Sequence, residues 1–91
     1  MKFSLGQVCV SAGVHSAITQ SPTFMQFVNN SLARHAEGDW GNVCSEDKEE
    51  NEFSLREGYR LLSAYEQDNQ KIWIITEADR SATTVLFPDE Y

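Results

Sequence analysis

Basic residues are scarce in this chain of 91 residues: seven Lys and Arg stand against fourteen Asp and Glu, giving a formal net charge of −7. This surplus of negative charge opposes non-specific attachment to nucleic acid or to anionic lipid. Direct nucleic-acid binding is therefore not expected. An acidic surface can instead imitate a phosphate backbone for a basic partner, although acidity also simply keeps a small protein in solution.

Long apolar runs are missing as well. No segment approaches the roughly 18 apolar residues of a membrane-spanning helix. Residues 1–7 contain one Lys and lack the apolar core of a signal peptide. We therefore expect a cytoplasmic protein that makes no contact with a membrane.

Cysteine is limited to Cys9 and Cys44, and histidine to His15 and His35. The cysteines form no Cys-x-x-Cys pair, so each is expected to be a free and mostly buried thiol. All four residues are too scattered for the ligand spacing of a local zinc site, and no metal is expected. Because the glycine-rich phosphate-binding patterns are also absent, no cofactor is expected.

Glycine and proline are few, with five and two residues, whereas 41% of the chain is hydrophobic and 11% is aromatic. This composition is typical of a globular protein and not of a disordered tail. Residues 1–91 are long enough for one modest hydrophobic core and too short for two. The sequence therefore predicts a single small domain over 1–91.

Two helices are predicted in the first half of the chain. Ser11 is a residue type that caps helices, and a short helix is expected over 12–19. Ser21-Pro22 is a sharper start signal, because proline at the first helical position lacks the N–H that would otherwise have no partner. The apolar residues that follow recur at helical spacing, and Gly38 is expected to end this second helix.

A third helix is expected over 46–57, capped by Ser45 and ended by Gly58. Its apolar content is thin, which is typical of a helix that packs on one side and is solvated on the others. The functional alternative is an inhibitor that mimics nucleic acid and binds a host DNA-binding protein or nuclease. The acidic face would then consist of Glu46, Asp47, Glu49, Glu50 and Glu52.

The longest β signal lies in the last third of the chain. Segments 59–65, 71–76 and 82–87 are rich in aromatic, β-branched and leucine residues, and short polar stretches separate them. An apolar run within 3–10 is either a fourth strand or an extended arm. The predicted fold is α+β, with two or three helices followed by a three-stranded antiparallel meander. In the middle strand both faces are apolar, and Trp73 is expected on the less protected one.

The densest polar cluster is the loop 77–81 between the last two strands. Its Glu77, Asp79 and Arg80 can pair with one another and hold the turn, contact a protein partner, or perform acid–base chemistry in a small hydrolase together with His35. The structural role is favoured over catalysis because one short loop supplies neither a cleft nor a desolvated base. No catalytic residue is assigned.

The turn 38–41 places a tryptophan between two glycines. Such a residue usually anchors a loop at the edge of the core, and partner binding is the alternative. His35, at the end of the apolar helical stripe, is likewise expected to be structural. The candidate interaction residues are Asp39, Trp40, Trp73, Glu77, Asp79, Arg80 and Ser81, for an unidentified protein partner, and a homodimer is left open.

Eight stretches are distinctive in combination: FSLGQV at 3–8, ARH at 33–35 followed by GDWG at 38–41, ED at 46–47, NE at 51–52, YRLLSAY at 59–65, KIWIITEADRS at 71–81 and FPDEY at 87–91. With these stretches the chain resembles a family of small bacterial proteins described as plasmid-related. The resemblance implies an accessory protein of a mobile element. The family supplies no established activity or catalytic residues, so a non-enzymatic protein-interaction module is the expected function.

Overall fold

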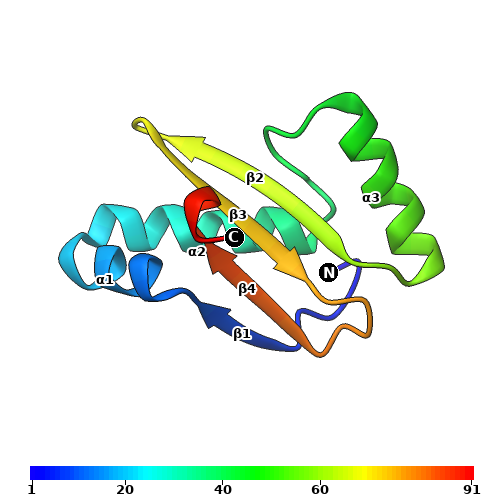
Figure 1. The fold of residues 1–91 in the computed structure, drawn as a ribbon, viewed down its shortest axis with the longest axis horizontal. Coiled ribbons are helices and arrows are strands. Elements are labelled where there is room, and N and C mark those ends of the chain that lie inside the picture. Colours follow the sequence, from blue (N-terminus) through cyan, green and yellow to red (C-terminus); the bar gives the residue numbers. More distant parts are fainter.

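The chain forms a four-stranded sheet and three α-helices in the computed structural model, which describes residues 1–91 (Figure 1). Along the chain the elements are β1 (Gln7–Val10), α1 (Ala12–Gln20), α2 (Pro22–Ala36), α3 (Ser45–Glu57), β2 (Leu61–Gln67), β3 (Gln70–Thr76), β4 (Ala82–Leu86) and the short 3₁₀ helix η1 (Pro88–Glu90). The predicted α+β fold is confirmed. No helix has both the length and the apolar character needed to cross a bilayer.

The sheet is mixed, with the strand order β1-β4-β3-β2. The predicted meander is confirmed, because β2 pairs antiparallel with β3 and β3 pairs antiparallel with β4. The N-terminal run supplies the fourth strand, but β1 pairs with β4 in parallel, so the sheet is not purely antiparallel. The long connection from β1 to β4, through three helices and two strands, permits this direction, whereas a hairpin would have forced the antiparallel one.

The first two helices begin as the sequence predicts. The Ser11 hydroxyl accepts from the Val14 N–H at 3.2 Å, and the Ser21 hydroxyl accepts from the Phe24 N–H at 3.1 Å. Pro22 occupies the first turn of α2. Each serine therefore provides a partner for a backbone donor that the first helical turn leaves free.

The start of α3 differs from the prediction by one residue. Cys44, not Ser45, is at the N-cap position, and its side chain makes no capping hydrogen bond. Glu46 and Asp47 lie in the first turn, where negative charge is favoured by the helix dipole. Gly58 ends the helix in the left-handed conformation, with φ of 81°, as predicted.

The hydrophobic core lies between the sheet and the first two helices, and Figure 1 shows α2 crossing behind the strands. Side chains from α1 and α2 pack on those of β2, β3 and β4 that point to this face. The fully or nearly buried members are Val14, Phe24, Phe27, Val28, Tyr65, Ile72, Ile74 and Val85. The opposite face carries no α-helix, and Trp73 is half-buried there, as expected from the alternation along β3.

The outer edge of β2 is closed by groups from other segments. The Asn51 side chain donates to the Leu62 carbonyl at 2.7 Å and accepts from the Leu62 N–H at 3.1 Å. Further along, the Ala64 N–H donates to the Trp40 carbonyl at 3.2 Å, and the Ala64 carbonyl accepts from the Asn42 N–H at 2.6 Å. The edge of β2 is thereby occupied as though a further strand were present.

Asn51→Ala should destabilise the fold by about 1–3 kcal/mol, because both backbone groups of Leu62 lose their partner. The free energy of unfolding in urea measures this loss. Asn30→Ala is the matched control: it is the same exchange within a helix, but the Asn30 side chain is exposed and bonds only the Gln26 amide. An equal effect of the two exchanges would show that Asn51 does not hold the edge of β2.

Candidate interaction surface

Arg80 holds the loop 77–81 against the end of α3. Its Nη1 donates to the Tyr59 carbonyl at 2.7 Å, and its Nη2 donates to the Ser54 carbonyl at 3.2 Å. Arg80 Nη1 also lies 3.2 Å from the Glu77 carbonyl within the loop. A cation at the C-terminus of a helix is favoured by the helix dipole. Arg80 therefore has a structural role, and its guanidinium is directed inward instead of toward a partner.

The other polar residues of the loop serve its turn and are exposed. Asp79 accepts from the Ser81 N–H at 3.0 Å, and hydrogen bonding from the Ser81 side chain and then its N–H lowers the pKa of the Asp79 carboxyl. The Glu77 carbonyl accepts from the Arg80 N–H at 2.9 Å. The structural interpretation of this loop accounts for its polar content, and only the exposed carboxylates of Glu77 and Asp79 remain available to a partner.

Asp39 and Trp40 belong to the support of the core. Asp39 forms an ion pair with Arg34 at 2.7 Å, and hydrogen bonding from the Arg34 side chain lowers the pKa of the Asp39 carboxyl. Trp40 is only 4% exposed, and its indole N–H donates to Glu52 at 2.7 Å. Trp40 is thus a loop anchor with no surface for a partner. Glu52, predicted as part of the acidic face, is engaged in holding it.

His35 is fully buried and joins a chain of hydroxyl groups. Its Nδ1 lies 2.5 Å from Ser63 Oγ, and its Nε2 lies 2.9 Å from Thr76 Oγ1. Thr76 Oγ1 is 2.7 Å from Thr83 Oγ1, which in turn donates to the Leu5 carbonyl at 2.7 Å. The chain connects α2 with β2, β3, β4 and the N-terminal segment.

The carbonyl at the end of this chain determines the direction of every hydrogen bond in it. Because a carbonyl only accepts, Thr83 donates to it and accepts from Thr76, which therefore accepts from His35 Nε2–H. A neutral imidazole then accepts from Ser63 at Nδ1. Burial, followed by the charge of Arg80, lowers the pKa of His35 from 6.5 to about 4, which agrees with the neutral form.

The structure does not bring the predicted hydrolase residues into one pocket. Both nitrogens of His35 are occupied inside the core, whereas Glu77 and Asp79 are exposed on their loop. The one surface pocket of the chain is lined by other residues. His35 has the structural role that its position in the helical stripe predicted.

Both cysteines are exposed and free, which corrects the expectation that they are buried. Cys9 lies on an edge strand, and Cys44 lies in the connection before α3. Cys9 lies between two valines, so its exposure cannot be recognised from its neighbours in the sequence. No three or more His, Cys, Asp or Glu side chains gather closely enough to hold a metal ion.

The face of the sheet that carries no α-helix presents a cluster of Arg60, Trp73 and Tyr91. The rings of Trp73 and Tyr91 lie 5.6 Å apart, at 68°, in an edge-to-face arrangement. Arg60 Nη2 donates to the Tyr91 hydroxyl at 2.6 Å. With the half-buried Leu62 these three residues form what we call the Trp73 surface. Of its members, only Trp73 was predicted as a contact residue.

Hydrogen bonds of η1 position Tyr91 on this surface. Glu90 accepts from the Ser11 hydroxyl at 2.6 Å and from the Gly13 N–H at 3.1 Å, at the start of α1. Hydrogen bonding from the Ser11 hydroxyl, followed by the Phe87 N–H, lowers the pKa of the Glu90 carboxyl. The alternation along β2 could have placed Arg60 beside Leu62, but nothing in the sequence indicates where the tail turns.

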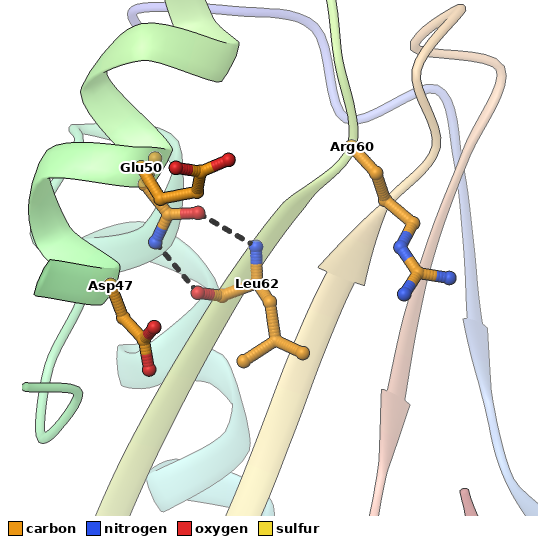
Figure 2. A pocket seen from close by; sticks show the side chains of 5 residues that line it. Asp47, Glu50, Arg60 and Leu62 are labelled. Atoms are coloured by element: carbon orange, nitrogen blue, oxygen red, sulfur yellow. Dashed lines mark hydrogen bonds between the residues drawn. The ribbon is translucent and has the colours of Figure 1, made fainter.

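A pocket of about 200 Å³ adjoins the Trp73 surface, between α3 and β2. Its lining consists of Asp47, Glu50, Asn51, Arg60 and Leu62. Figure 2 shows Asp47 and Glu50 on the α3 side of Leu62 and Arg60 on the other side. Neither carboxylate forms an ion pair, since the two ion pairs of the chain join Met1 with Glu37 and Arg34 with Asp39. The pocket therefore offers two carboxylates that form no ion pair, opposite the Arg60 guanidinium and next to an aromatic cluster.

No family model, curated protein or solved structure matches this chain.

Because His35 loses its proton more readily when folded, stability should fall as pH decreases. The unfolded chain binds a proton near pH 6.5 and the folded chain near pH 4, so the contribution is complete above pH 6.5 and is lost on the way to pH 4. The loss amounts to about 3 kcal/mol. Urea unfolding at pH 7 and pH 4.5 measures it.

His35→Gln isolates this contribution from that of the carboxylates, which also titrate in acid. The variant should show a weaker dependence of stability on pH, whereas His15→Gln, at an exposed position, should retain the dependence of the original chain. Should His35→Gln not fold, the imidazole proton signals in NMR give the same answer. A buried histidine that titrates near pH 6.5 would contradict the prediction.

Proposed function

We propose that this chain is a non-enzymatic protein-interaction module of the cytoplasm and that the Trp73 surface is its contact site. The observation that supports the proposal is the cluster of Arg60, Trp73 and Tyr91 on a sheet face without an α-helix. Arginine, tyrosine and tryptophan are the residues that most often dominate the binding energy of protein interfaces. This location replaces the loop 77–81 as the centre of the contact.

The chemistry around the cluster defines a complementary partner. Trp73 is half-buried and Tyr91 is 65% exposed, so an apolar side chain of a partner can lie against both rings. Asp47 and Glu50 line the adjoining pocket without an ion pair of their own. A basic side chain beside the apolar one would therefore find an acidic site at the rim.

The resemblance to plasmid-related proteins bears on the biological setting. It is the basis for proposing that the chain is an accessory protein of a mobile element, and that its partner is a protein of that element or of the host. The surplus of acidic residues is consistent with a protein partner that has a basic contact surface.

Tyr91→Ala and Trp73→Ala should each reduce capture of the protein partner by about tenfold or more, because removing one central aromatic contact costs about 2 kcal/mol. Affinity capture from the host, followed by quantification of the dominant partner, measures the change. Tyr91 is 65% exposed and lies outside the hydrophobic core, so its exchange leaves the core intact.

Tyr59→Ala is the matched control for this experiment. Tyr59 is 56% exposed and stacks on Phe53 instead of joining the Trp73 surface, so capture should be unchanged. Full capture by the Tyr91→Ala and Trp73→Ala variants would remove this surface from the proposal. Equal losses in all three variants would point to reduced stability and not to a contact.

A second candidate function is the inhibition of a basic nucleic-acid-binding protein by mimicry. The specific observation in its favour is that no carboxylate of α3 forms an ion pair, while Glu46, Asp47, Glu49 and Glu50 are all exposed. Exposed acidic groups along a helix can take the place of successive phosphates for a basic groove.

Binding of the original chain to the basic partner should weaken steeply as the salt concentration rises, and exchange of Glu46, Glu49 and Glu50 for Gln should abolish it. Binding is measured between about 50 mM and about 300 mM salt, because the screening of charges increases over this range. Glu52 is left unchanged because it accepts from the Trp40 indole. Binding that survives the triple exchange would exclude mimicry by α3.

A further inference from the structure

The two edge strands of the sheet differ in whether their outer backbone groups have hydrogen-bond partners. The β2 edge is occupied by Asn51, Asn42 and the Trp40 carbonyl, whereas β1 is the terminal strand on the other side. All four residues of β1 are exposed, with Val8 at 45% and Val10 at 37%. The strand contains no charged residue and no proline, the usual devices that prevent pairing at an edge.

The backbone of β1 presents hydrogen-bonding groups to solvent at two positions. Gln7 N–H donates to the Ser81 carbonyl at 3.0 Å, and Ser11 N–H donates to the Val85 carbonyl at 2.9 Å, so the odd-numbered residues face β4. Alternation along the strand turns the N–H and C=O of Val8 and Val10 to the free edge. Figure 1 shows no element beyond β1 on this side.

We propose that β1 pairs antiparallel with β1 of a second copy of this chain, about a twofold axis that passes beside Cys9. The two four-stranded sheets would then join into one continuous sheet. This interface lies at an edge of the sheet, and it is separate from the Trp73 surface, which lies on the face.

The register follows from the conformation at the two ends of β1. With the axis at Cys9, Val8 of one copy lies opposite Val10 of the other, and every outward N–H and C=O of these two residues finds a partner. An axis at Val8 would oppose Val10 to Gly6, which has a φ of 64° and is not extended. An axis at Val10 would oppose Val8 to Ala12, which is already helical.

A second copy is the occupant that the composition of the strand favours. The net charge of −7 makes copies of this chain repel one another over most of their surface, but β1 carries no charge, and so the repulsion is weakest at this edge. A copy also supplies what the edge needs, which is a neutral extended segment with a valine opposite each valine.

Disulfide formation at Cys9 can be used to detect the proposed pairing of the two β1 strands. In the proposed register the two Cys9 residues face each other as a pair that shares no hydrogen bonds, for which the Cα atoms lie about 4.5 Å apart. This separation is compatible with a disulfide. Cys44 is equally free and exposed but lies outside β1, so it serves as the internal comparison.

Mild oxidation of the full chain by copper–phenanthroline in air should produce a covalent dimer linked through Cys9. The Cys44→Ser chain should form this dimer as fast as the original, and the Cys9→Ser chain should form little covalent dimer of any kind. Non-reducing electrophoresis and mass spectrometry of the linked peptides identify the cysteine. A dimer linked through Cys44, or no dimer at all, would overturn the proposal.

Val8→Pro separates edge pairing from a chance encounter of thiols. Because the Val8 N–H points outward, proline removes two hydrogen bonds of the dimer and none to β4. Crosslinking through Cys9 should fall about tenfold or more, while circular dichroism should show an unchanged fold. Undiminished crosslinking in a folded Val8→Pro chain would contradict the pairing.

Sedimentation equilibrium of the reduced chain tests the same association without a disulfide. The original chain should show a dimer fraction that rises with concentration, and the Val8→Pro chain should remain monomeric. A monomer at every concentration of the original chain would exclude self-pairing. This outcome would leave the result of partner capture at the Trp73 surface unaffected.

Discussion

The hydrogen-bonded chain through His35 is the polar contact that runs through the core from α2 across the sheet to the N-terminal segment. It links α2 to three strands and to the Leu5 carbonyl in the N-terminal segment, all inside the core. No buried side-chain nitrogen or oxygen lacks a partner. Because an unsatisfied polar group inside a core is costly, the chain specifies one arrangement of helix and sheet.

The same chain explains the position of β1. Thr83 on β4 donates to Leu5, which places the N-terminal segment beside β4 just before β1 begins. β1 then continues along β4 in parallel, and α1 starts directly after it at Ser11. The last position in the sheet is therefore taken by a short strand whose outer edge stays open.

The two edges of the sheet have different consequences for binding. At β2 the Asn51 amide replaces a strand, which leaves a pocket beside α3 and Arg60 instead of a free edge. At β1 nothing replaces a strand, and the free groups remain available to a second chain. The proposed contacts at the Trp73 surface and at β1 therefore lie on different parts of the sheet.

The sequence by itself determined the local elements, because their signals lie within a few residues of one another. Ser11, Ser21-Pro22 and Gly58 mark helix ends, and alternation along 61–76 marks strands and their faces. Only the tertiary structure decided the parallel direction of β1, the inward role of Arg80 and the exposure of Cys9. Arg80 joins Ser54, and Tyr91 reaches Arg60, across 26 and 31 positions of the chain. Such contacts depend on where distant segments pack, and the spacing of residues in the sequence does not predict that packing.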